Sequence, residues 1–143
     1  MLKNILLMGF IPTTLAIVGC TTTATIQKQE NLNLLQNKTW VMTHIGATAY
    51  PNKANTPIIQ FGSDLRVSGS DGCNRIMGSY AVQDYRLNLD SIASTKMLCQ
   101  NEMALVEKYT IALSKVTAYQ TYEHTLKLVD KYGNVVLQYK IAP

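Results

Sequence analysis

The sequence predicts an α+β domain, in which a curved antiparallel β-sheet of about eight short strands packs on a single α-helix. Most of the chain consists of short runs rich in β-branched and aromatic residues, which favour strands. Turn residues such as Gly, Asn and Asp separate these runs, and such short connections join neighbouring strands as antiparallel hairpins. A single segment has the hydrophobic period of a helix, and one helix with one apolar face needs a sheet to cover it.

The expected strands follow one another with short turns, apart from a longer loop over residues 46–57 that contains Pro51. Residues 62–64 and 83–85 are expected to form two hairpin turns, and residues 130–134 form the last one. The strands are expected over residues 40–45, 58–61, 65–68, 76–82, 86–89, 115–122, 125–129 and 135–141.

The helix is expected to begin near Asn101, a residue type that caps helix N-termini well, and to run to about Ser114. At about 100° per residue, one face collects the apolar side chains while Glu107 lies opposite. Ile111 is the apolar residue that falls outside this face. The expected buried face consists of Leu105, Val106, Tyr109, Ala112 and Leu113.

Residues 1–19 have the layout of a secretory signal peptide, with Lys3 near the start, a short apolar middle and a small residue at the exit. The sequence Ile-Val-Gly-Cys, which ends at Cys20, resembles a bacterial lipobox, in which the peptidase cleaves before a cysteine that carries diacylglycerol. Two other interpretations are cleavage by an ordinary signal peptidase and an uncleaved membrane helix. The apolar stretch is shorter than the roughly 20 residues of a membrane span and contains Pro12. Ile17 stands where an ordinary signal peptide more often has a small residue.

Lipidation of Cys20 predicts the membrane as a partner, because the three acyl chains of a mature bacterial lipoprotein hold a chain firmly to a bilayer. Thr21 is not the Asp that favours inner-membrane retention in Gram-negative bacteria. The expected location is therefore the outer membrane, facing the periplasm. Residues 20–33 are polar and Thr-rich, and we expect them to tether one domain that spans residues 34–143.

The charge of the chain is mildly basic. Without the leader it has 12 Lys and Arg residues, the 13 of the full chain less Lys3, against 9 Asp and Glu. These basic residues are scattered along the sequence, whereas nucleic-acid binding needs a clustered basic surface. The sequence therefore predicts no nucleic-acid partner.

Cys73 and Cys99 lie in a domain expected outside the cytosol, where a disulfide is the first interpretation. Two buried free thiols and a metal site are the alternatives. Neither cysteine belongs to a CxxC pair, and His44 and His124 have no ligand spacing to them, so neither a metal nor a cofactor is expected. Spacing along the chain does not fix the distance between the two Cα atoms, so the pairing stays open at this point.

The densest group of unusual residues is the segment 68–75, Ser-Gly-Ser-Asp-Gly-Cys-Asn-Arg. Its glycines allow tight turns, and Asp71 and Asn74 can bond their own backbone, so one interpretation is a structural connection stapled by Cys73. The other interpretation is an exposed loop in which Asn74 and Arg75 hold an anionic or peptide ligand. Asp71, Asn74 and Arg75 are therefore the candidate binding residues.

The sequence contains no recognisable catalytic motif. A serine could be combined with His44 or His124, but GxSxG, P-loop, HExxH and EF-hand patterns are absent from the sequence. No catalytic residue is assigned, and a convergent hydrolase site remains the least favoured hypothesis. Four tyrosines could form an aromatic binding surface, although packing explains them as well: Tyr119, Tyr122, Tyr132 and Tyr139.

Two motifs resemble those of a known family. The pattern Cys-Asn-Arg-x-x-Gly-x-Tyr ends at Tyr80, and the pattern Thr-x-Met-x-Cys ends at Cys99. Together with Trp40 and the closing hairpin over residues 126–139, they resemble the META domain family, also called HslJ-like. The resemblance covers residues 34–141.

The resemblance implies a compact sheet with one helix and a role in the envelope, in stress or in drug tolerance. It implies no catalytic mechanism, so we expect a protein that is not an enzyme. Lys96 and Met77 differ from the residues that the family often has there, and neither changes the expected fold. The alternative function is an interaction module for an envelope protein, such as a protease inhibitor or an assembly factor, that uses the loop from Asp71 to Arg75. The oligomeric state is left open.

Overall fold

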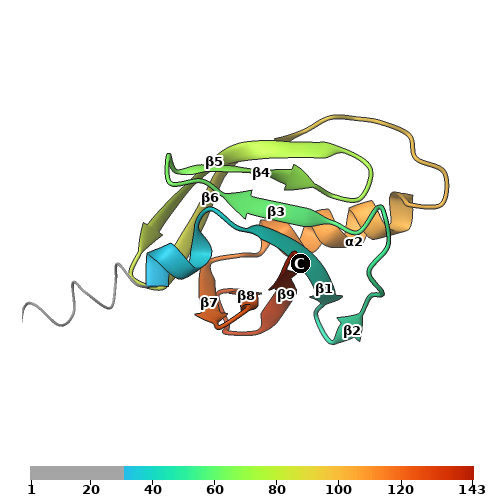
Figure 1. The fold of residues 1–143 in the computed structure, drawn as a ribbon. Helices are drawn as coiled ribbons and strands as arrows, with labels where there is room; N and C mark the ends of the chain where they lie inside the picture. Colours follow the sequence, from blue (N-terminus) through green and yellow to red (C-terminus); the bar gives the residue numbers. More distant parts are fainter. Residues whose placement is uncertain (1–30) are drawn as a thin grey trace, which may run out of the picture.

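The computed structural model describes residues 31–143, and Figure 1 shows their fold. The expected leader, Cys20 and the tether up to residue 30 lie outside the described residues. Residues 31–35 form a short helix that ends in the fully buried Leu35. This helix overlaps the last residues of the expected tether, and Leu35 is its one buried side chain. No helix among residues 31–143 is long and apolar enough to cross a membrane.

Every strand pair among residues 31–143 is antiparallel, and nine strands are present where the sequence predicts about eight. The additional strand lies in the expected 46–57 loop, where two exposed residues pair back on the preceding strand. The strands are β1 (Thr39–Ile45), β2 (Thr48–Ala49), β3 (Ile58–Phe61), β4 (Arg66–Ser70), β5 (Arg75–Gln83), β6 (Arg86–Ser94), β7 (Ala118–Tyr122), β8 (Thr125–Val129) and β9 (Val135–Ile141).

The sheet closes on itself because β1 pairs with both β3 and β9. Trp40 of β1 lies opposite Ile59 on one side and opposite Ile141 on the other. The joint between β6 and β7 is much shorter, with Arg86 opposite Ala118 as its one register pair among the described residues. The predicted curved antiparallel sheet is confirmed, and its curvature is strong enough to bring the first and last long strands together.

The interior of this closed sheet is filled by side chains that alternate along the strands. In β1, Trp40 and Met42 are buried between half-buried neighbours, as the period of two in a strand requires. Phe61 and Tyr80 meet edge to face, with their ring centroids 5.1 Å apart, a favourable aromatic geometry. The largest fully buried side chains are Trp40, Tyr109, Tyr119, Tyr139, Phe61, Leu35, Met42, Ile59, Leu87, Leu126, Leu128 and Leu137.

Helix α2 (Met103–Ser114) packs on β9 and β1, and it passes behind β1 and β3 in Figure 1. The helix begins close to the predicted start, but Asn101 is not its N-cap, because Asn101 has a left-handed φ of 71° and lies in the preceding turn. The N-cap is Glu102, whose side chain makes no capping hydrogen bond. Ile111 is exposed, as predicted from its place off the apolar face. That face is confirmed, with Val106, Tyr109, Ala112 and Leu113 buried and Leu105 half-buried.

Two strand boundaries differ from the sequence prediction by three residues or more. β7 begins at Ala118 rather than at Lys115, because the backbone N–H of Lys115 still bonds into the last turn of α2. β6 continues to Ser94 through a bulge, where Ser91 has a φ of 52° and the register with β5 shifts opposite Gly78. A side chain at Gly78 would meet the carbonyl oxygen of Asp90, so glycine is required there.

Candidate binding surfaces

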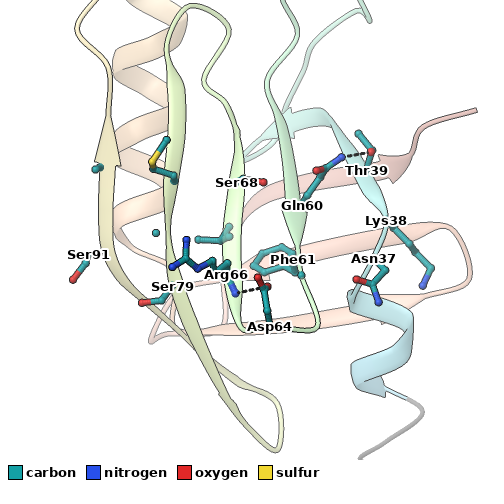
Figure 2. Close-up of a pocket in the computed structure, with 15 residues that line it drawn as sticks. Asn37, Lys38, Thr39, Gln60, Phe61, Asp64, Arg66, Ser68, Ser79 and Ser91 are labelled. Carbon is teal, nitrogen blue, oxygen red and sulfur yellow. Dashed lines mark hydrogen bonds between the residues drawn. The ribbon is translucent and has the colours of Figure 1, made fainter.

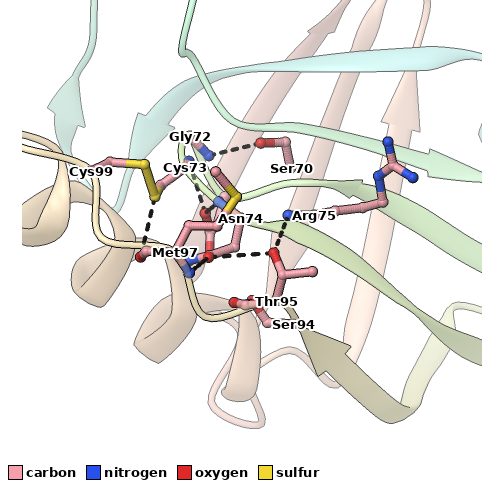
Figure 3. Close-up of a disulfide and its surroundings, with 10 residues drawn as sticks. Ser70, Gly72, Cys73, Asn74, Arg75, Ser94, Thr95, Met97 and Cys99 are labelled. Atoms are coloured by element: carbon pink, nitrogen blue, oxygen red, sulfur yellow. Dashed lines mark hydrogen bonds between the residues drawn. A yellow bond between two sulfur atoms is a disulfide. The ribbon is translucent and has the colours of Figure 1, made fainter.

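The first candidate surface is the loop over residues 71–75, shown in Figure 3. The carboxylate of Asp71 holds this loop from inside, because Oδ1 accepts the backbone N–H of Cys73 at 3.0 Å and of Asn74 at 2.6 Å. This is the arrangement by which Asp side chains stabilise turns. Gly72 occupies the left-handed region with a φ of 102°, which favours glycine at this position.

Asn74 joins this loop to the second sequence motif. Its Nδ2 donates to Oδ2 of Asp71 at 3.2 Å, and its Oδ1 accepts the backbone N–H of Met97 at 2.6 Å. Next to it, the backbone N–H of Arg75 donates to Oγ1 of Thr95 at 3.1 Å. The two motifs, far apart in the sequence, are therefore the two halves of one hydrogen-bonded unit.

A disulfide completes this unit. The Sγ atoms of Cys73 and Cys99 lie 2.00 Å apart, and their Cα atoms lie 5.9 Å apart. Of the three interpretations left open by the sequence, the structure has the disulfide. Among residues 31–143, no group of three or more His, Cys, Asp or Glu side chains is placed to hold a metal ion.

The exposed-loop interpretation fails for two of its three residues. Asp71 is 2% exposed and Asn74 is 5% exposed. The polar atoms of both side chains already accept hydrogen bonds from the backbone, Asp71 from Asn74 and Asn74 from Met97. Arg75 is exposed and points away from the loop in Figure 3. The loop is thus a structural connection, and of the three candidates Arg75 is the one that can touch a ligand.

The side of this unit that faces solvent comes from residues 95–99, which sequence reasoning did not consider as a contact surface. Met97 is 56% exposed and Leu98 is 93% exposed. The sequence did contain a sign of this surface. Met97 and Leu98 are apolar residues in a segment that has the hydrophobic period of neither a helix nor a strand.

The second candidate surface is a groove of about 850 Å³ on the outside of the sheet, shown in Figure 2. Its floor is a row of side chains that stand opposite one another on five adjacent strands, from β1 through β3, β4 and β5 to β6. Oγ1 of Thr39 accepts a hydrogen bond from Nε2 of Gln60 at 2.5 Å, so the row is ordered at this end. The row consists of Thr39, Gln60, Ser68, Met77 and Ala93.

The charges of the groove are mixed. The ammonium group of Lys38 donates to the carbonyl oxygens of Asn33 and Gln36, at 2.6 and 3.3 Å, so it is partly used by the chain itself. The Asp64 carboxylate accepts the backbone N–H of Arg66 at 3.1 Å in the turn between β3 and β4. The Arg66 side chain extends over the sheet towards Ser79 in Figure 2. The Arg66 guanidinium and the Ser68 hydroxyl therefore remain for a ligand, whereas the Gln60 amide nitrogen and Oγ1 of Thr39 already bond each other.

The groove rests on a buried hydrogen-bonded group. Tyr80 donates from its hydroxyl to the carbonyl oxygen of Gly62 at 2.6 Å, and Nε2 of Gln36 donates to the same hydroxyl at 2.6 Å. Burial raises the pKa of Tyr80, while the hydrogen bond from Gln36 lowers it. Gly62 lines the groove, so the tyrosine of the first motif fixes the edge of the groove from within the core.

The tyrosines and histidines that the sequence offered as candidate binding or catalytic residues lie partly in the core and partly on the surface. Tyr119 and Tyr139 are buried, whereas Tyr122 and Tyr132 are exposed on different turns, so the four tyrosines do not form one aromatic surface. His44 is half-buried and His124 is exposed. Nδ1 of His44 lies 3.0 Å from the hydroxyl of its neighbour Thr43, and neither histidine lines the groove.

These features define a small α+β domain in which a closed antiparallel sheet carries a groove with mixed polar and apolar lining and a disulfide-held loop. The family model of the META domain matches residues 33–142. The chain belongs to the META domain family.

A curated relative is the heat shock protein HslJ of Escherichia coli (strain K12), which is 28% identical over 93 residues. The match covers 65% of this chain and 64% of HslJ, so it spans just under two thirds of that relative.

Two solved structures confirm the fold. An NMR structure of a protein from Burkholderia xenovorans has a TM-score of 0.62 at 24% identity, and the match covers 94% of this chain and 99% of that one. The crystal structure of a DUF4847 family protein from Bacteroides vulgatus has a TM-score of 0.57 at 17% identity, with 76% and 94% covered. At these identities the likeness concerns the fold alone.

Proposed function

We propose that the protein is a lipoprotein, held by acyl chains on Cys20 at the periplasmic side of the outer membrane, whose META domain acts by binding rather than by catalysis. The heat shock relative HslJ supports a role under stress, and the proposed anchor on Cys20 suggests that this role concerns envelope integrity. The ligand is a polar component of the envelope that lies in the groove over β3, β4 and β5.

The observation that carries this proposal is the lining of the groove. It offers hydroxyl, amide and guanidinium groups, and its floor is a row in register across five strands. A rigid sheet holds such groups in fixed positions, so little side-chain freedom is lost when a ligand binds. A pocket usually fixes the orientation of a polar ligand with a few placed polar groups, such as backbone groups, Ser, Thr or Gln side chains and one charged residue.

The anchor and the groove need separate tests. For the anchor, Cys20→Ala in the full chain should move the protein from the membrane fraction to the soluble fraction. Globomycin, which inhibits the lipoprotein signal peptidase, should make the uncleaved form accumulate. Unchanged fractionation and processing would show that the anchor proposal is wrong.

For the groove, a strain that lacks the protein would be complemented with Ser68→Tyr, which fills the floor of the groove. Gln120→Tyr is the matched control, because Gln120 is also exposed on a strand but lies on β7, outside the groove. We expect growth at elevated temperature to be lost with Ser68→Tyr and kept with Gln120→Tyr, at equal protein levels and equal melting temperatures. Full complementation by Ser68→Tyr would exclude the groove.

A further inference from the structure

The loop over residues 95–99 places apolar side chains in solvent. Leu98 is 93% exposed and Met97 is 56% exposed. A side chain as exposed as Leu98 gains almost no free energy of burial when the domain folds, since the hydrophobic gain scales with the area removed from water. The Leu98 side chain and the exposed part of Met97 are therefore available to a partner.

The same loop is held firmly at its base. Cys99 is bonded to Cys73, and the backbone N–H of Met97 donates to the buried Oδ1 of Asn74 at 2.6 Å. At the start of the loop, the backbone N–H of Thr95 donates to the carbonyl oxygen of Arg75 at 3.1 Å. A loop fixed in this way loses little conformational entropy on binding, which is the usual gain from preorganisation.

Positive charge flanks the two apolar side chains. Lys96 directly precedes Met97, and the backbone N–H of Arg75 donates to Oγ1 of Thr95 at the base of the loop. Both cationic side chains are exposed, and that of Arg75 points away from Met97 in Figure 3. Glu102 is half-buried at the start of α2 and is the nearest acidic residue along the chain. Charge complementarity therefore calls for a partner with carboxylates around an apolar pocket.

The position of the loop separates it from the attachment point of the chain. In Figure 1 the connection between β6 and α2 lies at one end of the domain, and the short helix at residues 31–35 lies at the other. If Cys20 carries the anchor, as proposed above, the loop lies at the end of the domain opposite to the one where the tether joins it. A protein partner fits this placement better than the lipid surface does.

We propose that the 95–99 loop is a docking site for a protein of the envelope, with Leu98 and Met97 inserted into an apolar pocket that acidic side chains surround. Leu98 is the central contact, Lys96 contacts the rim, and Arg75 adds positive charge at the base of the loop. Leucine and methionine side chains can adapt to such a pocket, and a central buried anchor with a polar rim is the usual anatomy of a protein interface.

The test uses the full chain in its own cells, with the photo-crosslinking residue benzoylphenylalanine at Gln100. Gln100 is exposed and adjacent to the loop, so Leu98 itself is left intact. We expect one discrete adduct with a different protein, at least about tenfold weaker when Leu98→Asp or the pair Lys96→Glu and Arg75→Glu is added. The control places the same crosslinker at Tyr122, which is 74% exposed at the end of β7 and should not yield this adduct.

The adduct protein is then purified and titrated against the soluble domain. We expect Leu98→Asp to weaken binding at least about tenfold, Leu98→Met to weaken it about threefold or less, and neither to change the melting temperature. The proposal is overturned by the absence of an adduct, by an adduct that survives Leu98→Asp, by the same adduct from Tyr122, by an adduct of the chain with itself, or by adducts with lipid alone. Fractionation of Cys20→Ala tests the anchor independently, so failure of the anchor and failure of the docking site are distinguishable.

Discussion

The hydroxyl oxygens of Tyr109 and Tyr139 lie 3.0 Å apart in the core and join α2 to β9. Both side chains are fully buried, so this hydrogen bond has no competition from water. Burial raises the pKa of Tyr109 even though the hydrogen bond to Tyr139 lowers it. Burial also raises the pKa of Tyr139 well above its ordinary value. The helix is thus held by a polar contact that requires neutral phenols.

The first prediction concerns alkaline pH. Both phenols have a higher pKa when folded than the unfolded value of about 10, so the unfolded chain releases these protons first. Their contribution to stability is complete below pH 10 and is lost as the pH rises above it. Urea unfolding between pH 8 and pH 11.5 should show a smaller loss of stability for the double variant Tyr109→Phe/Tyr139→Phe than for the wild type. Equal losses would contradict the assignment, because Tyr80 and Tyr119 titrate in both proteins.

The second prediction compares two single hydroxyl deletions in the core. Tyr109→Phe leaves the hydroxyl of Tyr139 without its partner and should lower the free energy of unfolding by about 1–2 kcal/mol. The hydroxyl of Tyr119 is buried without a hydrogen-bond partner among residues 31–143. Tyr119→Phe should therefore leave the stability unchanged within about 0.5 kcal/mol, or raise it. Equal destabilisation of the two variants in urea unfolding would contradict this distinction.

The third prediction concerns the loop that joins the two sequence motifs. Asn74→Ala removes the bonds to Asp71 and to the backbone of Met97, and it should destabilise the domain by about 2 kcal/mol. Arg75→Ala is the neighbouring control, because the side chain of Arg75 is exposed, and its effect should stay within about 0.5 kcal/mol. The two melting temperatures measure the difference. A large shift for Arg75→Ala would show that Arg75 has a structural role as well.

The fourth prediction concerns the disulfide. It spans 26 positions, for which the chain-entropy model gives about 3 kcal/mol of stabilisation. For a domain of this size, reduction should lower the melting temperature by roughly 10 °C. The variant Cys73→Ser/Cys99→Ser should melt at the temperature of the reduced protein and show no further response to reductant. Two alkylatable thiols in the native, oxidised domain would refute the bond.

Much of the fold follows from patterns within single segments. The alternation of Trp40 and Met42 in β1 marks a strand with one buried face, and the spacing of Val106 and Tyr109 marks the buried face of α2. β2 was missed because both of its residues are exposed and show no alternation. Closure of the sheet was missed because a pattern within a strand reports which face is buried but not which strand lies beside it.

The binding surfaces were harder to predict for the same reason. Ser68 and Gln60 look like any solvent-facing residues of a strand, and only the register of five strands makes them the floor of a groove. Asp71 and Asn74 were correctly recognised as turn formers. Asn74 also accepts a hydrogen bond from the backbone N–H of Met97, which is 23 positions away. A pattern within one segment does not show such a distant partner, so the burial of Asp71 and Asn74 was not predicted.

The pairing of β1 with β9 makes the integrity of the domain depend on the last residues of the chain. Trp40 lies opposite Ile141, so the first long strand has its second neighbour only when β9 is present. Without β9, both β1 and β8 would present free edges with unpaired backbone groups, and such edges are templates for aggregation. A chain truncated within β9 would thus leave backbone groups of both β1 and β8 unpaired. We expect such a chain to be degraded readily by proteases.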